Sequence, residues 1–508
     1  MRRTVPFALL VGVLTPSVAL AQRARDDAPA RDESVRDEAP PPRDPVFMLA
    51  ESARFVDVVD SFDRGSTFSF RLSAGYLYQH RTATIEREMR MSDGVNGAGL
   101  VQFARVGDYV ENTHTLLVNA EVGLFHDLAL TFGVPVVLSN TREIRTLADP
   151  GPAEGNAALR DGWSQDGRPT SLFNVPFASP TRSGIDQVRL GLAWSILSQA
   201  RVRANPTWTV RFEWRPPVGD VMHACNGSAT PGVADCPSPS SVPSPPPAGS
   251  INSVGTATRP TSAGTPGISR GLNGIYFQTA LARRFGFIEP YAGLDILAEF
   301  PLRSTPFRYS DTPYGQLASY PPITSSLVVG AEVIPFENRE TWQRLVIDLR
   351  VRGTYRSQGR DYSPLYDALG SSTSRALAVP GCPSNVRNPD GSCQPGREIW
   401  FDGLTTTQSY LSVNGQLAIG AQPVKWMRFD LGLGLTWVAP HLITATDACN
   451  PSESIPADHP EWRGGCVNDS APDPTHRPVI DQVGGRFRTN NELLVDFFAS
   501  VSLTPRFF

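Results

Sequence analysis

The chain has 508 residues and a formal net charge of −4, with 43 glycines and 46 prolines that favour turns over long helices. Its 46 basic residues do not exceed its 50 acidic ones, so nucleic-acid binding is not expected. Beyond the N-terminus no apolar run is long enough for a membrane-spanning helix.

The first 21 residues have the pattern of a secretory signal peptide. Arg2 and Arg3 precede an apolar stretch that ends at Ala19–Leu20–Ala21, with small residues at the cleavage positions. We expect cleavage before Gln22, and an uncleaved anchor is the alternative. No cysteine follows the site, so we expect no lipid anchor.

Residues 22–65 are predicted to form a disordered periplasmic linker. Arginine alternates with aspartate and glutamate up to three prolines at 40–42, a composition that cannot bury a core. Met48, Phe55, Val59 and Phe62 then recur at helical spacing, which predicts a short amphipathic helix over residues 47–62. This helix would dock loosely, cap the periplasmic side or plug a larger structure.

From Phe68 onward, apolar and polar residues alternate, which is the pattern of strands with one apolar face. The pattern occurs twelve times, at 68–78, 116–124, 128–138, 188–196, 208–214, 275–281, 288–296, 325–333, 345–355, 411–419, 427–437 and 493–503. Short and long connections alternate between these strands, and aromatic residues lie near the strand ends. All these features are typical of outer-membrane barrels.

We therefore predict an all-β fold for residues 66–508, a transmembrane antiparallel up-and-down β-barrel of about 12 strands with long extracellular loops. A soluble secreted β-protein is the alternative, since its strands also alternate. The predicted location is the outer membrane of a Gram-negative bacterium, with outer-membrane lipid and the barrel-assembly machinery as partners. Phe507 and Phe508 follow the last strand directly and resemble the C-terminal aromatic assembly signal. The sequence leaves the oligomeric state open.

The six cysteines fall into three pairs, and each pair lies within one long connection. We predict three extracellular disulfides: Cys225–Cys236, Cys382–Cys393 and Cys449–Cys466. Metal binding with nearby histidines is the alternative, but the spacing matches no regular zinc motif.

The polar face of the predicted barrel carries charges of both signs on neighbouring strands. We expect the lumen to be lined by Arg71, Glu121, Arg189, Arg211, Glu213, Arg215, Glu332, Asp348, Arg350, Arg352 and Asp496. The pairs predicted across strands are Arg189 with Glu213, Glu332 with Arg350, and Arg71 with Asp496 across the barrel closure. This mixture favours a salt-bridge lattice over an ion-selective ring.

No catalytic, cofactor-binding or metal site is predicted. His114 lies on a strand wall, but an outer-membrane phospholipase would need a serine where this chain has Leu116. Sequence motifs of other hydrolases and of nucleotide binding do not occur. We therefore expect neither enzymatic activity nor a cofactor, and an outer-membrane hydrolase is the third hypothesis.

Three segments resemble strands of the meta-pathway phenol-degradation family of outer-membrane proteins. LFHDLALTFGVP at 124–135 is similar to the family's tight turn and G-x-P strand. GIDQVRLGL at 184–192 resembles its G-x-G-D-x-x-L-G strand, with the second glycine replaced and the aspartate displaced. RPPVGD at 215–220 resembles its P-T-G-D strand end, with valine for threonine. The resemblance covers residues 66–300 and implies porin-like uptake of hydrophobic aromatics, but it transfers no ligand residue.

Together these observations predict passive, porin-like transport of small, hydrophobic or aromatic solutes. The alternative is a non-transporting surface or structural barrel that displays disulfide-tied extracellular loops, because the long connections hold many residues. The identity of the solute, and whether the lumen is open or plugged, are left open.

Overall fold

A computed structural model describes residues 53, 55–59, 68–91, 100–161, 171–230, 233–237, 261–262, 265–302, 307, 320–338, 340–377, 379–380, 398–399, 401–454, 470–473, 475–504 and 506–507. All of them belong to one compact unit, Pro45–Phe508.

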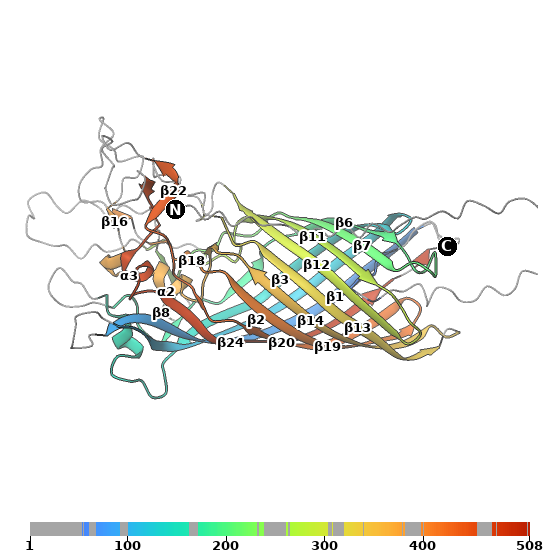
Figure 1. The fold of residues 1–508 in the computed structure, drawn as a ribbon, viewed down its shortest axis with the longest axis horizontal. Helices are drawn as coiled ribbons and strands as arrows, with labels where there is room; N and C mark the ends of the chain where they lie inside the picture. Colours follow the sequence, from blue (N-terminus) through green and yellow to red (C-terminus); the bar gives the residue numbers. More distant parts are fainter. Residues whose placement is uncertain are drawn as a thin grey trace, which may run out of the picture. The chain divides into compact units, whose positions relative to one another are not determined.

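Twelve long strands form a closed antiparallel barrel (Figure 1). They are β1 (Phe68–Met91), β2 (Leu100–Phe125), β3 (Leu128–Arg145), β6 (Arg189–Leu197), β7 (Thr207–Arg215), β11 (Leu272–Ala282), β12 (Ile288–Pro301), β13 (Thr324–Asn338), β14 (Gln343–Arg356), β19 (Tyr410–Val424), β20 (Met427–Val438) and β24 (Phe487–Leu503). Each pairs with the next, and β24 pairs with β1 from Leu72–Leu503 to Arg87–Phe487, which closes the ring. The predicted barrel and its strand number are confirmed.

The remaining elements are short. They are β4 (Phe177–Ala178), β5 (Arg182–Ile185), β8 (Asn226–Thr230), β9 (Val233–Pro237), β10 (Thr261–Ser262), β15 (Gly359–Asp361), β16 (Val379–Pro380), β17 (Glu398–Ile399), β18 (Thr405–Thr407), β21 (His441–Leu442), β22 (Cys449–Ser454), β23 (Ser470–Pro472), β25 (Arg506–Phe507), the helices α2 (Tyr366–Gly370) and α3 (Pro478–Asp481), and the 3₁₀ turns η1 (Gly155–Leu159) and η2 (Arg375–Leu377). In the described ranges no helix has the length and apolar character to cross a membrane. The elements α2, α3, β16 and β22 gather at the long-connection end of the barrel (Figure 1).

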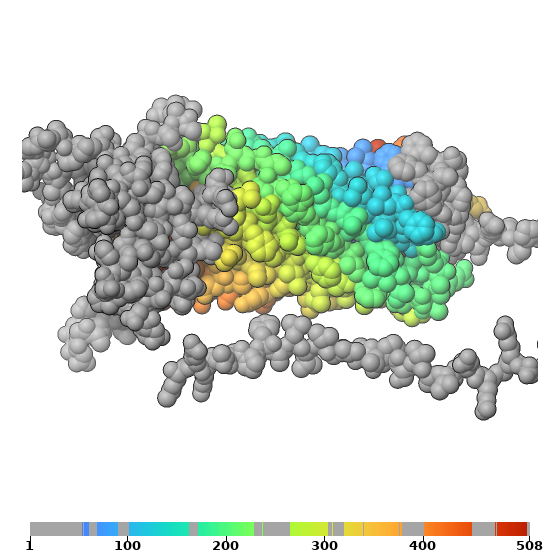
Figure 2. All heavy atoms as spheres, turned by 90° about the horizontal axis from the view of Figure 1, so that it is seen from above, coloured from blue at the N-terminus to red at the C-terminus, as the bar shows by residue number. Residues whose placement is uncertain are grey.

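The apolar side chains of the strands point outward. On β20, Leu431, Leu433 and Leu435 are 50%, 54% and 52% exposed, whereas Asp430 on the other face is 6% exposed. The same alternation around the ring makes an apolar outer wall, one side of which is seen in Figure 2. An apolar surface of this extent requires lipid around it, and a closed ring leaves no unpaired backbone edge in that lipid. The chain is therefore an outer-membrane β-barrel.

Tight turns connect the strands at the other end, which we call the short-turn end. His126 and Asp127 join β2 to β3 with φ values of 23° and 38°, the left-handed backbone that a two-residue hairpin needs. Asp127 suits this conformation, and its carboxylate is held 2.6 Å from Arg201 of the next short connection. Lys425 and Trp426 form a similar two-residue link between β19 and β20. By the rule for bacterial barrels, this end faces the periplasm.

Leu433→Arg tests the orientation of the wall, because it places a charge on the lipid face. We expect a loss of about 2–4 kcal/mol in the free energy of unfolding from lipid vesicles, measured by urea titration. Gln416→Arg is the matched control on the adjacent strand, because Gln416 lines an internal cavity and pairs opposite Gly434. A larger loss for Gln416→Arg than for Leu433→Arg would mean that the two faces are assigned the wrong way round.

Candidate functional site

The barrel lumen contains a cavity of about 310 Å³. Its lining includes Arg211, Arg350, Arg352 and Arg428, the carboxylates Glu332, Asp348 and Asp430, the amides Gln278 and Gln416, and the aromatic rings of Phe55, Tyr276 and Phe498. All but Phe55 belong to barrel strands, whose period-two alternation turns these side chains inward. The cavity wall is therefore polar and charged, with aromatic patches.

Most charges predicted for the lumen are held in ion pairs along the inner wall. The pairs and their N–O distances are Arg71–Glu121 (3.1 Å), Arg211–Glu121 (3.3 Å), Arg215–Glu213 (2.7 Å), Arg350–Asp348 (2.8 Å) and Arg352–Asp295 (3.4 Å). Both signs occur around the ring, although like charges also meet, as where Glu289 of β12 lies opposite Glu332 of β13. The arrangement is a lattice of compensated charges rather than a selectivity ring.

The pairing predicted across the barrel closure, Arg71 with Asp496, is wrong. Asp496 lies opposite Gln79 and accepts a hydrogen bond of 2.9 Å from its Nε2 atom. Arg71 lies eight positions from Gln79 on β1, toward the short-turn end. The stagger between the first and last strands decides this partner, and alternation within each strand carries no information on stagger.

The other two predicted pairs are replaced by contacts within one strand. Arg350 pairs with Asp348 where Glu332 was expected, and Arg215 pairs with Glu213 where Arg189 was expected. Residues two apart share a strand face, and an arginine side chain is long enough to reach a carboxylate two positions away. Glu332 itself lines the cavity, and the Arg189 side chain lies beside Gly133 of β3.

A short N-terminal stretch crosses the lumen toward the short-turn end. We call its described residues, Ala53 and 55–59, the plug segment. The Ala53 N–H donates to Glu289 Oε1 of β12 at 2.9 Å, and the Asp57 carboxylate pairs with Arg71 of β1. Strands β12 and β1 lie on opposite sides of the twelve-stranded ring, so the segment spans the lumen from wall to wall.

The plug segment lies where the sequence predicted a linker. Phe55 and Val56 form a turn instead of the predicted helix, and most of residues 47–62 fall outside the described ranges. Ala53 and Val56 are 0% and 1% exposed because they pack against Ala280, Tyr291 and other inward side chains. Of the apolar residues that suggested a helix face, Phe55 and Val59 lie in the described range: Val59 is buried, and Phe55 packs against this cluster.

At the opposite end, the long connections form a lid over the lumen. Leu159 and Phe173 from the β3–β6 connection share one buried cluster with Leu369 and Phe401 from the β14–β19 connection. These two connections begin on opposite sides of the ring, so their side chains must meet above the lumen. Ser374 Oγ also donates to Asp161 Oδ2 across this gap at 3.2 Å.

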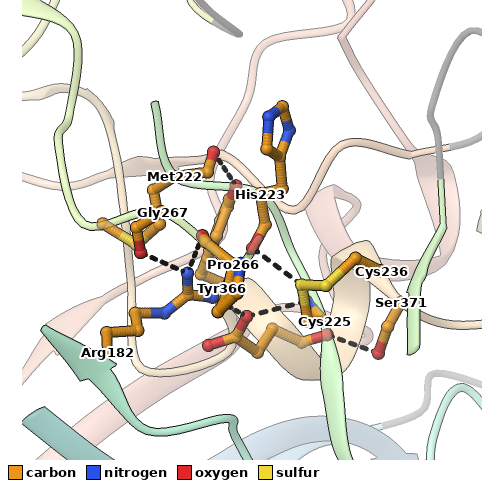
Figure 3. The surroundings of a disulfide bond; sticks show 10 residues. Arg182, Met222, His223, Cys225, Cys236, Pro266, Gly267, Tyr366 and Ser371 are labelled. Carbon is orange, nitrogen blue, oxygen red and sulfur yellow. Dashed lines mark hydrogen bonds and ion pairs between the residues drawn. A yellow bond between two sulfur atoms is a disulfide. The ribbon is translucent and has the colours of Figure 1, made fainter. Parts of the chain in front are cut away.

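A buried ion pair links the parts of the lid (Figure 3). Arg182 of β5 lies 2.5 Å from Asp367 of α2, and their side chains are 0% and 2% exposed. Arg182 also donates to the carbonyl oxygens of His223 and Gly267, at 2.8 and 3.0 Å. Asp367 Oδ1 accepts the N–H of Cys225 at 2.9 Å. One ion pair therefore joins three long connections.

The predicted disulfide Cys225–Cys236 is confirmed and lies beside this ion pair (Figure 3). Cys449 is disulfide-bonded as well, while Cys382, Cys393 and Cys466 lie outside the described residues. Of the predicted assembly signal, Phe507 pairs with Phe68 of β1, and Phe508 is outside the described residues.

The histidines and carboxylates of the described part of the chain form no metal site. His114 Nδ1 lies 2.6 Å from the Tyr76 hydroxyl on the outer wall. Across the described ranges, no group of three or more histidine, cysteine, aspartate or glutamate side chains is arranged to hold a metal ion.

Sequence reasoning missed the wall residue that contacts the plug segment and the ion pair of the lid. Tyr291 has a usable signal, since it shares the polar parity of β12 with Glu289 and is therefore an aromatic ring facing the lumen. Arg182 and Asp367 lie in connections without periodicity, where only the folded lid brings them together.

No protein-family model matches the chain, and no curated protein matches it. Among solved structures, an outer membrane channel from Pseudomonas putida F1 is similar at 10% identity and a TM-score of 0.34, over 87% of this chain and 99% of that one. A FadL homologue from Pseudomonas aeruginosa shares 11% identity over 87% and 90%, with a TM-score of 0.30. The deltaS2 mutant of the TodX monoaromatic hydrocarbon channel shares 9% identity over 87% and 91%, with a TM-score of 0.33. With identities of 9–11% and TM-scores of 0.30–0.34, these similarities assign no function to this chain.

Arg182→Ala should open the lid locally, because it leaves the Asp367 carboxylate buried without its cation. Removing one partner of a buried pair costs about 3–5 kcal/mol, so we expect faster amide hydrogen exchange at α2 in the folded barrel. Arg105→Ala is the control: its pair with Glu154 is on the surface, with Arg105 49% exposed, and solvent screens such a pair, so its loss should leave α2 unchanged. Equal exchange in both variants would show that the ion pair does not hold the lid.

Proposed function

We propose that this outer-membrane barrel is a passive conduit for small aromatic solutes that carry a polar or charged substituent. The observation that carries the proposal is the lumenal cavity of about 310 Å³ beside Phe55 of the plug segment, lined by guanidinium groups, carboxylates and aromatic rings. Diffusion along a concentration gradient would drive the movement.

The composition of the cavity wall supports this solute class. A fully apolar solute would displace water from charged groups without replacing its hydrogen bonds, which is unfavourable. An aromatic ring offers a π face to the guanidinium groups of Arg350 and its neighbours, and a polar substituent can accept their hydrogen bonds. Small aromatic solutes of mixed polarity therefore suit the wall better than hydrocarbons do.

The dimensions of the lumen support small solutes. Barrels of about eight strands are filled by side chains, and those of sixteen or more leave an aqueous channel. With twelve strands and an inner wall of long charged side chains, this lumen suits molecules of about one ring.

The alternative function is that of a structural barrel that transports nothing. The lid's apolar cluster joins connections from opposite sides of the ring, as expected of a permanently closed mouth. The two functions differ in whether solute crosses the membrane at all.

Solute flux through the full-length protein in proteoliposomes decides between them. We expect benzoate to equilibrate faster than in protein-free vesicles, because the lumen admits a single charged ring. The trisaccharide raffinose should be retained, because it is too large for the cavity. Retention of benzoate in the proteoliposomes would support the structural barrel instead.

Deleting residues 23–62 should raise single-channel conductance in planar bilayers, because it removes the segment that joins β1 to β12 across the lumen. Deletion of residues 23–43 is the control, since it keeps the plug segment and shortens the same N-terminal region. The two deletions should therefore differ. If both conduct like the full-length protein, the plug segment does not limit passage.

A further inference from the structure

The side chain of Phe55 occupies a defined position on the inner wall. Its ring stacks on Tyr291, with centroids 5.3 Å apart and planes 26° from parallel. The guanidinium carbon of Arg350 lies 5.1 Å from the centroid of the Phe55 ring. A Cβ atom on Gly293 would lie 2.6 Å from Phe55 Cε1, so a glycine is needed there to make room for the ring. We call Tyr291, Gly293 and Arg350 the ring cradle.

The ring cradle is held by bonds of the barrel wall itself. The Tyr291 hydroxyl donates to Asp348 Oδ1 and accepts a hydrogen bond of 2.9 Å from Arg350 Nε. Arg350 also pairs with Asp348 at 2.8 Å, and Tyr291 is 3% exposed. These bonds do not involve Phe55, so the cradle is preorganised for an aromatic ring whichever molecule supplies it.

Phe55, which occupies the cradle, belongs to the plug segment, whose described residues make few polar contacts with the wall. Beyond its apolar packing, the described plug segment is tied to the wall by the Ala53–Glu289 hydrogen bond and the Asp57–Arg71 ion pair. Phe55 and Arg350 both line the cavity, so a solute there lies directly beside the cradle.

We propose that the ring cradle is an aromatic-binding subsite of the conduit, in which Phe55 takes the place of a monoaromatic carboxylate. The proposal rests on the proposed function, because it names a binding site within the same conduit. The solute's ring would stack on Tyr291 beside Arg350, where stacking and the cation–π interaction act together. Its carboxylate would enter the cavity, whose lining has four guanidinium groups against three carboxylates. Binding displaces Phe55 and so weakens the hold of the plug segment.

Phe55→Ala provides the test, because it empties the cradle and leaves the wall unchanged. Benzoate binding is measured by calorimetry on the full-length chain in detergent micelles, with empty micelles as the blank. We expect benzoate to bind about tenfold more tightly to Phe55→Ala than to the parent protein, because it no longer competes with the internal ring. Cyclohexanecarboxylate has the same charge and similar size without a π face, and it should gain much less.

Two further variants in the Phe55→Ala background identify the site of the gain. Adding Tyr291→Leu should abolish it, whereas adding Tyr291→Phe should retain it, because the ring is kept and only the hydroxyl is lost. Unchanged benzoate affinity in Phe55→Ala, or an equal gain for cyclohexanecarboxylate, would overturn the subsite. Persistence of the gain with Tyr291→Leu would overturn it too.

The flux assay separates this proposal from the proposed function. Benzoate flux without any effect of Phe55→Ala on binding would overturn the cradle and leave the conduit standing. A tenfold gain in binding without flux would support the cradle as a binding site and overturn the conduit.

Discussion

Every part of this molecule depends on the pairing of β24 with β1, which closes the sheet. Backbone N–H and C=O groups facing lipid have no water to bond with, so an open edge inside the membrane would be very costly. Closure satisfies these groups all round the ring and turns alternate side chains either to lipid or to the lumen. The apolar outer wall and the charged inner wall both follow from it.

Closure of the barrel also determines the environment of the side chains in the lumen. The inner wall is shielded from bulk solvent, so its charges need partners close by, and arginines pair with carboxylates along it. The lid and the plug segment use the same chemistry at the two ends: Arg182 with Asp367 in the lid, and Asp57 with Arg71 at the plug. The lid and the plug segment thus both combine an ion pair with apolar packing.

The ring cradle, as proposed, would let a polar lumen select aromatic molecules. Tyr291 stands among charged neighbours, and the hydrogen bonds of its hydroxyl to Asp348 and Arg350 hold its ring in place. Selection of aromatic solutes by ring faces and guanidinium groups does not require an apolar channel lining. The plug segment meets this site through Phe55, whose ring stacks on Tyr291.

Alternation along the chain determined the number of strands, their apolar faces and the location in a membrane, because period two is a local property of each segment. The placement of two cysteines in one connection was likewise enough to predict Cys225–Cys236. Only the tertiary structure decided that Asp496 meets Gln79, that Arg182 meets Asp367, and that Phe55 lies on Tyr291. These contacts depend on strand stagger and on loops crossing a closed ring, and both are set by residues hundreds of positions apart.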